Sequence, residues 1–352
     1  MSKDKDAAAI CVIGENNANV VTFSKALLVT LSGMCTPVAT LGTFQKKEDL
    51  AVPYSTIKVT KSWRNKGCRE VVYKSSERPD LLPHVQASLE LWGFNSYLDY
   101  LYTVCELGFL ESQVPVINLG FLTPNEMKTL TEVAALIKVP LDTMDDYVNE
   151  VHYNQDKEKR ILRRIRNIEW AGKLKFPTIT GFVIGRKDSA DSHKEWLTYI
   201  AKMHLKYGMI HEVVLHNFCP VEGISTQQYD PPSKKEMLDA VALAKSILPE
   251  DIPVIVPLAL NQDIKPFLKM GIRDLGSIFC GYNSFIKTYP DVNLDAIFSI
   301  LEPMGLVPQQ RFPLRRDFIL AEKYSKKLSQ VFEPYRYKLK KNMQEKVKES
   351  KA

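Results

Sequence analysis

Short apolar stretches recur along the chain, each bounded by turn-forming residues. Such near-continuous apolar runs are typical of strands buried on both faces of a parallel sheet. We therefore predict eight strands, at Val20–Thr30, Glu70–Lys74, Val114–Leu119, Val139–Thr143, Thr178–Ile184, Glu212–Asn217, Val254–Pro257 and Asp274–Cys280.

Between the strands, apolar residues return at helical spacing, which predicts amphipathic helices. Two of these segments carry start signals: Thr123 precedes a proline, and Ser233 stands three residues before Glu236 as a capping box. Gly271 is a stop signal for another. The predicted helices lie at Pro124–Ile137, Asp156–Lys173, Ser192–Tyr207, Ser233–Leu248 and Asp263–Met270.

Strands that alternate with helices predict a parallel sheet with right-handed crossovers. Closed on itself, this sheet is a (β/α)8 barrel of the TIM type, and one such domain explains the length of 352 residues. We expect an N-terminal segment at 1–18, the barrel at 19–319 and a basic helical tail at 320–352.

Charge is concentrated in that tail. Residues 320–352 hold ten Lys/Arg and four Asp/Glu, which equals the formal net charge of +6 for the whole chain. The remaining body is formally neutral, so it gives no electrostatic case for nucleic acid.

The tail is expected to be divided by Pro334. After it, Tyr335, Leu339, Met343 and Val347 recur every four residues, which predicts a narrow apolar stripe on a lysine-rich helix. Two interpretations stay open: a terminal helix packed on the barrel or solvated, and a helix that docks a protein partner or makes a weak contact with an anionic surface.

Composition and cysteine spacing bear on the cellular compartment of the protein. No apolar run approaches the ~18 residues of a membrane span, and the N-terminus shows no convincing cleavage site, so we expect neither a membrane segment nor a secretory signal. The cysteines form no C-x-x-C pair, which suits a reducing cytoplasm. They are Cys11, Cys35, Cys68, Cys105, Cys219 and Cys280.

Many short motifs resemble one family in the same order along nearly the whole predicted barrel. The segments GCREVVYKSSERPDL, IEWAGKLKFPTITGFVIG and MHLKYGMIHEVVLHNFCPVEG carry most of the resemblance, and PQQRFPLRRDFI resembles the closing segment. The chain resembles the first, or G-type, subunit of the deazaflavin (FO) synthase of F420 biosynthesis. This resemblance implies a barrel of the radical S-adenosylmethionine type, an iron–sulfur cluster and S-adenosylmethionine as cosubstrate.

The sequence departs from this family where the cluster would be bound. The family's C-x3-C-x2-C loop follows the first strand, and here Cys35 holds the first position while Ala39 and Gly42 hold the other two. The later family turns also differ, reading GRKDSADS at 185–192 and GSIFCGY at 276–282. One thiolate cannot hold a four-iron–four-sulfur cluster with one open iron. We therefore expect no cofactor.

Other thiols offer an alternative. Cys35, Cys219 and Cys280 all fall at or just after the C-terminal ends of predicted strands, where barrels build their active sites. They would form a three-thiolate metal site there. The plainer interpretation is that each is a small buried or loop residue.

Six polar residues near the predicted rim are candidates for binding a ligand. By resemblance, Asn217, Asn261 and Asp274 would line the substrate cavity. The alternative is that such side chains satisfy loop backbone groups. The candidates are Asn118, Thr180, His216, Asn217, Asn261 and Asp274.

Two functions from different classes remain. The missing cysteines favour a pseudoenzyme that binds a protein partner or a small ligand. The alternative is an active enzyme of the deazaflavin synthase type with unorthodox cluster ligands, or one that performs cluster-independent chemistry in the cavity.

Overall fold

The computed structural model describes residues 19–32, 50–75, 78–143, 157–185, 190–219, 230–279 and 292–349. Eight parallel strands in it form one sheet in the order β7-β6-β5-β4-β3-β2-β1-β8, and a short β9 pairs with the start of β1. The strands are β1 (Val20–Thr30), β2 (Glu70–Lys74), β3 (Val114–Asn118), β4 (Leu136–Lys138), β5 (Thr178–Ile184), β6 (Ile210–Asn217), β7 (Val254–Ile255), β8 (Asp274–Phe279) and β9 (Val307–Gln310).

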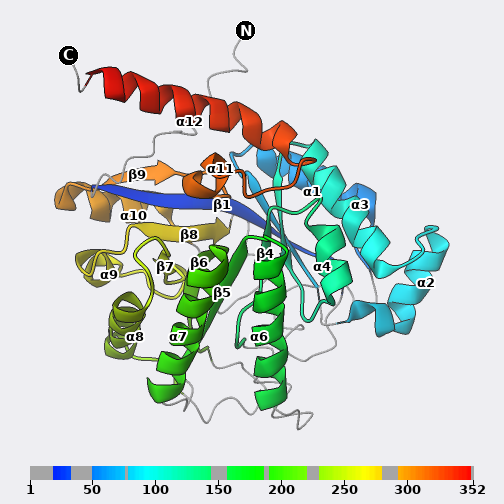
Figure 1. Ribbon diagram of the computed structural model, residues 1–352, viewed down its shortest axis with the longest axis horizontal. Coiled ribbons are helices and arrows are strands. Elements are labelled where there is room, and N and C mark those ends of the chain that lie inside the picture. Colours follow the sequence, from blue (N-terminus) through cyan, green and yellow to red (C-terminus); the bar gives the residue numbers. More distant parts are fainter. Residues whose placement is uncertain are drawn as a thin grey trace.

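Helices surround this sheet and connect its strands (Figure 1). Among the described residues they are α1 (Pro53–Arg64), α2 (Pro83–Leu91), α3 (Tyr97–Leu110), α4 (Pro124–Leu130), α6 (Lys157–Lys173), α7 (Ala190–Tyr207), α8 (Lys234–Ile247), α9 (Lys265–Lys269), α10 (Leu294–Leu301), α11 (Arg316–Leu320) and α12 (Ser329–Glu349), with 3-10 turns at Pro79–Leu81 and Glu302–Met304.

The two edges of the sheet approach each other, so the barrel is nearly closed. Gly276 of β8 lies against Ile255 of β7, where an added Cβ would come within 2.6 Å of the isoleucine side chain. Its φ of +70° is one that glycine adopts without strain. The predicted (β/α)8 barrel is confirmed.

Most predicted elements are present within a residue or two. The capping box of Ser233 and Glu236 is present at the start of α8, and Thr123 and Glu126 form a second one at α4. Each box satisfies two backbone N–H groups that the first helical turn leaves free.

One helix and one strand were misplaced. The helix predicted to reach Ile137 ends at Leu130, and β4 begins at Leu136, three residues before the predicted Val139. Pairing with β5 nevertheless continues to Leu141, whose N–H donates to the carbonyl of Gly181 at 2.7 Å. The run from 133 to 137 is apolar throughout, so it shows no periodicity that distinguishes helix from strand.

The closing segment of the chain plugs one end of the barrel. Leu314, Phe318 and Phe332 are fully buried against inward-facing residues from the N-terminal halves of the strands, among them Val72 and Leu136. Figure 1 shows α12 crossing the top of the view, above α11 and β1. The N-terminal end of the barrel is therefore filled with side chains, and the other end remains for a site.

The tail prediction was wrong on Pro334 and right in part on packing. Pro334 lies inside α12 near its start, where it removes one backbone hydrogen bond without ending the helix. Leu339 is buried, and the Tyr335 ring stacks on Phe312 with centroids 4.2 Å apart. Met343 is 44% exposed. The first half of the stripe therefore packs on the barrel, while the Val347 side chain lies outside the described residues.

Candidate functional site

The inward-facing side chains become more exposed from the N-terminal to the C-terminal ends of the strands. Near the N-terminal ends of the strands they are buried, as at Ala26, Val72 and Glu212. Near the C-terminal ends they are partly or largely accessible, as at Lys74 and His216. This gradient defines a lumen that is closed below and accessible at the C-terminal end, where barrels of this type carry their sites.

An ion-pair network forms the closed end. Arg311 enters from the closing segment: its Nε donates to Asp274 Oδ2 at 2.7 Å, and Nη2 donates to Glu212 Oε2 at 2.8 Å. The neighbouring His211 accepts the backbone N–H of Arg315 at Nε2, 3.0 Å away. Two strands and the closing segment are thereby fixed to one another.

Burial and charge set the ionisation of this network. Burial opposes the charge of Glu212, but the hydrogen bond from His211 and the Arg311 guanidinium lower its pKa to about 2. Burial also disfavours the Arg311 cation, yet the charges of Asp274 and Glu212 raise its pKa above the ordinary value. Glu212 and Arg311 are therefore both ionised at neutral pH.

Glu70 on β2 lies beside this network. Both its carboxylate oxygens accept from Ser277 Oγ, at 2.8 and 2.9 Å. Burial raises the pKa of Glu70, and the charge of Lys138 offsets part of that rise. Lys138 therefore lies close above the buried acids.

Above the network, lysines occupy the accessible part of the lumen. Lys138 of β4 places its ammonium group 5.2 Å from the centre of the Phe279 ring on β8. These strands are four positions apart in the sheet, so the lysine spans the lumen. Lys74 pairs in register with Thr30 on one side and Asn118 on the other.

His216 faces these groups from β6. Burial within the protein, and the charges of Lys138 and Lys74, lower its pKa to about 4. Part of the residue is accessible at the C-terminal end of β6. The imidazole is therefore neutral at pH 7 and available for hydrogen bonding.

Three of the six predicted residues have hydrogen-bond partners within the protein. Thr180 donates to the Val139 carbonyl at 2.8 Å. Asn217 and Asn261 exchange amide hydrogen bonds of 3.2 and 2.7 Å, and Asn261 also donates to Pro257 O. These contacts fix the rim where β6 and β7 end.

Asp274 was expected near the rim, and that placement was wrong. It is the first residue of β8, at the opposite end of the barrel, where it pairs with Arg311 and accepts the Gly276 N–H at 2.8 Å. Asn118 and His216 are the predicted candidates that the structure brings to the lumen.

Lys74 and Lys138 were missed by sequence reasoning. Each is the last residue of a short strand whose other residues are buried. A charged residue at the end of a buried parallel strand indicates a site residue, because that position lies at the C-terminal end of the barrel. This signal could have identified both lysines.

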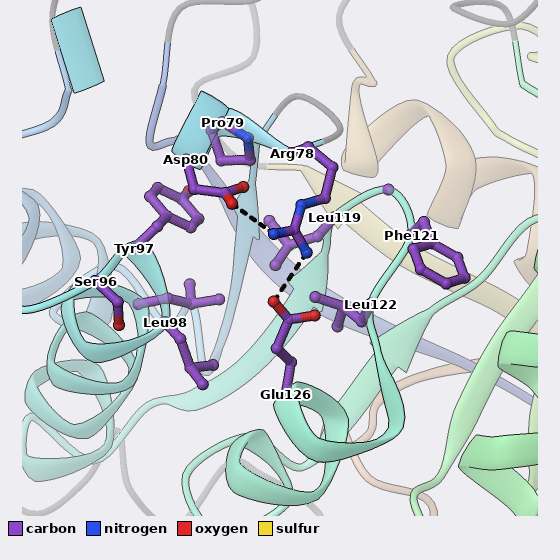
Figure 2. A pocket seen from close by; sticks show the side chains of 12 residues that line it. Arg78, Pro79, Asp80, Ser96, Tyr97, Leu98, Leu119, Phe121, Leu122 and Glu126 are labelled. Carbon is purple, nitrogen blue, oxygen red and sulfur yellow. Dashed lines mark hydrogen bonds and ion pairs between the residues drawn. The ribbon is translucent and has the colours of Figure 1, made fainter. Parts of the chain in front are cut away.

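A separate cavity of about 270 Å³ lies where β2 and β3 end, between the turn at Pro79–Leu81, the start of α3 and the loop before α4. Figure 2 shows Arg78 between two carboxylates. Its guanidinium donates to Asp80 at 2.5 Å and to Glu126 at 2.9 Å. Glu126 also belongs to the α4 capping box, so the arginine ties two loops of the rim together.

Cys35 and Cys280 lie outside the described residues. Cys219 follows β6 and is partly buried. Within the described ranges, no group of three His, Cys, Asp or Glu side chains could hold a metal ion. The three-cysteine alternative therefore stays a prediction.

The fold is a nearly closed parallel (β/α)8 barrel of the TIM type, with accessible polar residues at the C-terminal ends of its strands. A solved structure of HydG, a maturase of the [FeFe]-hydrogenase, matches 91% of this chain and 78% of its own with a TM-score of 0.62 at 13% identity. At that identity the likeness shows the fold alone. A Bacillus subtilis HMG-CoA lyase matches at a TM-score of 0.50 and 12% identity, covering 91% of this chain and 94% of its own.

Curated relatives show the family. A 7,8-didemethyl-8-hydroxy-5-deazariboflavin synthase of Methanococcus aeolicus is 30% identical over 309 residues, 86% of each chain. Synthases of the same name from Methanococcus maripaludis and Archaeoglobus fulgidus are 31% and 30% identical, covering 89% and 90% of this chain and 96% and 97% of their own. The chain belongs to this deazaflavin (FO) synthase family.

No protein-family model matches the chain. In the part of the chain that the structure describes, no helix is both long and apolar enough to cross a membrane.

Proposed function

We propose that this chain is a member of the deazaflavin synthase family that binds a ligand or partner and does not run the family's radical reaction. The observation that carries this proposal is the set of possible ligand side chains in the sequence that follows β1. Between 33 and 49 the only thiol is Cys35, and Ala39 and Gly42 offer no ligand atom.

The family's cofactor does not fit this set of side chains. A four-iron–four-sulfur cluster with one open iron requires three thiolates, which one loop can supply only if its cysteines are closely spaced. With one thiolate the reductive cleavage of S-adenosylmethionine has no site, so no step of this proposal passes through a cluster.

The rest of the barrel supports a binding role. The closed end is fixed by the Arg311 network, and residues at the C-terminal ends of the strands carry hydrogen-bonding side chains, among them Asn118 and His216. A cavity with a few convergent polar groups is the usual form of a small-molecule site.

One observation favours the alternative of an active enzyme. Cys219 follows the C-terminal end of β6, at the end of the barrel where chemistry takes place. With Cys35 and Cys280 it would supply three thiolates. An active enzyme would then form a cluster by unorthodox ligands, or it would use the cavity for cluster-independent chemistry.

An assay of S-adenosylmethionine cleavage separates the proposal from an enzyme that runs the radical reaction with unorthodox cluster ligands. After anaerobic treatment with iron and sulfide, and in the presence of a strong reductant, we expect no cleavage above that of a sample without protein. Sustained cleavage that depends on the protein would overturn the proposal. Cys219→Ser then tests whether the rim thiol is responsible.

The second part of the proposal concerns the exposed side of α12. We propose that this side contacts an acidic surface of a protein partner. Lys338, Lys340 and Lys341 are exposed beside Tyr337, which is 71% exposed. Because Tyr335 and Leu339 of the same helix are packed, the helix presents these lysines in a fixed array. Charged arrays of this kind raise association rates and give contacts that weaken with salt.

Charge reversal tests this contact. The triple variant Lys338→Glu, Lys340→Glu, Lys341→Glu should lose binding to poly-L-glutamate, measured by fluorescence anisotropy at low salt. A matched triple variant on α4 and α7, at the exposed Lys128, Lys194 and Lys202, should keep most of it. Equal losses in both variants would mean that net charge alone, and not this face of α12, determines binding.

A further inference from the structure

The charges inside the barrel are separated along its axis. The acids Glu70, Glu212 and Asp274 are all less than 10% exposed and lie at the N-terminal ends of their strands. Arg311 pairs with two of them from below. The lysines lie above, at the last residues of β2 and β4. A ligand that enters from the accessible end therefore meets ammonium groups before it meets carboxylates.

Lys138 forms the floor of the accessible part. Its ammonium group lies 5.2 Å from the centre of the Phe279 ring, a cation–π contact. Because β4 and β8 lie on opposite sides of the barrel, this contact reaches across the lumen. The upper surface of this floor is cationic.

A row of polar side chains forms one wall above the floor. Thr30, Lys74 and Asn118 are level with one another across three neighbouring strands. All three face inward, because Ala26, Val72 and Val116, which precede them by an even number of residues, pack in the core inside the barrel. A hydroxyl, an ammonium and an amide group, all hydrogen-bond donors, are thus presented side by side.

His216 faces this row from β6 on the other side of the lumen, opposite Val183 of β5 in register. As a neutral imidazole it adds a donor or an acceptor without repelling the lysines. The wall, floor and opposite side therefore carry donors and cations, while the acids lie below Lys138.

We propose that the accessible lumen binds a small molecule through an oxyanion, a carboxylate or a phosphate group, held by Lys74 and Lys138 with Thr30 and Asn118 as further donors. This inference rests on the proposed ligand-binding function and gives the chemical class of its ligand. Charge-assisted hydrogen bonds from two ammonium groups are the strong contacts of such a site. The site has no need of a cluster.

His216 provides a spectroscopic reporter for the test. An anion beside the two lysines offsets the positive charge that lowers the pKa of His216, so bound anion raises that pKa from about 4. The full-length protein, labelled in its histidine rings, is titrated by NMR with phosphate and, separately, with acetate and succinate at constant ionic strength. His216→Gln assigns the signal.

We expect a saturable shift of the His216 signal in the titration with phosphate or in one of the titrations with a carboxylate. The titration that saturates shows whether the site binds a phosphate or a carboxylate group. Lys74→Met and Lys138→Met should each weaken binding about tenfold or more, since each removes a charge-assisted contact. Lys202→Met, on the exposed side of α7, should bind as wild type.

The outcomes separate this inference from the function on which it rests. A response that never saturates, or equal binding by wild type and both lumen variants, overturns the oxyanion site. Iron content is measured on the same preparations. Stoichiometric iron would overturn the cluster-free function. The oxyanion site would still stand or fall on the anion titration.

Discussion

Replacing Arg311 with methionine is expected to destabilise the protein by about 3–5 kcal/mol, because it leaves two buried carboxylates without their partner. The Arg311 side chain is 11% exposed, and those of Glu212 and Asp274 are 3% and 10% exposed. Equilibrium unfolding in urea at pH 7 measures the change. Arg163→Met, at an exposed position on α6, is the matched control and should change stability by less than about 0.5 kcal/mol.

The ion pair of Arg311 with Glu212 also predicts how the stability of the protein depends on pH. The pKa of Glu212 is lowered to about 2 in the folded protein, below the value of about 4.3 for an unpaired glutamate. Its stabilising contribution is therefore complete above the unfolded pKa and is lost as pH falls towards 2. The difference between wild type and Arg311→Met should shrink over that interval. A methionine variant as stable as wild type at pH 7 would contradict this role of the network.

Phe332→Ala is expected to destabilise the protein by about 3–5 kcal/mol, the usual cost of truncating a fully buried phenylalanine. Phe332 is 0% exposed, and its ring lies 4.8 Å from that of Tyr324 and 5.5 Å from that of Phe312, centroid to centroid. The alanine leaves a cavity between α12 and the N-terminal end of the barrel.

Tyr337→Ala on the same helix is the control for that variant. Tyr337 is 71% exposed, so its truncation should leave the midpoint of denaturation nearly unchanged. If both variants unfold at the wild-type midpoint, α12 does not seal the barrel. If both are equally destabilised, the effect belongs to the helix itself and not to the packing of Phe332.

The barrel could be predicted from the sequence because its signals are local. Apolar runs bounded by turn residues identified most of the strands, and Ser233 with Glu236 identified a helix start to the residue. The signal failed at β4, where apolar residues from 133 to 137 suit a helix and a buried strand equally. It failed again at Pro334, since a proline near the start of a helix costs less than one in its middle.

The site was less predictable because its contacts are far apart in the chain. Arg311 meets Glu212 across 99 positions and Asp274 across 37, and no local pattern encodes either pair. Asn118 and His216 were recognised as polar residues at strand ends. Lys138 was not, because the strand that carries it had been placed too late in the sequence.

The absence of a radical-reaction cluster is the central claim, and iron content tests it most directly. The wild-type protein is reconstituted anaerobically with iron and sulfide, desalted, and assayed for iron and for absorbance near ~400 nm, the thiolate–iron region. The double variant Ala39→Cys, Gly42→Cys restores the three-thiolate spacing and serves as the positive control. We expect wild type to retain no stoichiometric iron and the variant to bind about four iron atoms per chain. About four irons per wild-type chain, with the matching absorbance, would contradict the account.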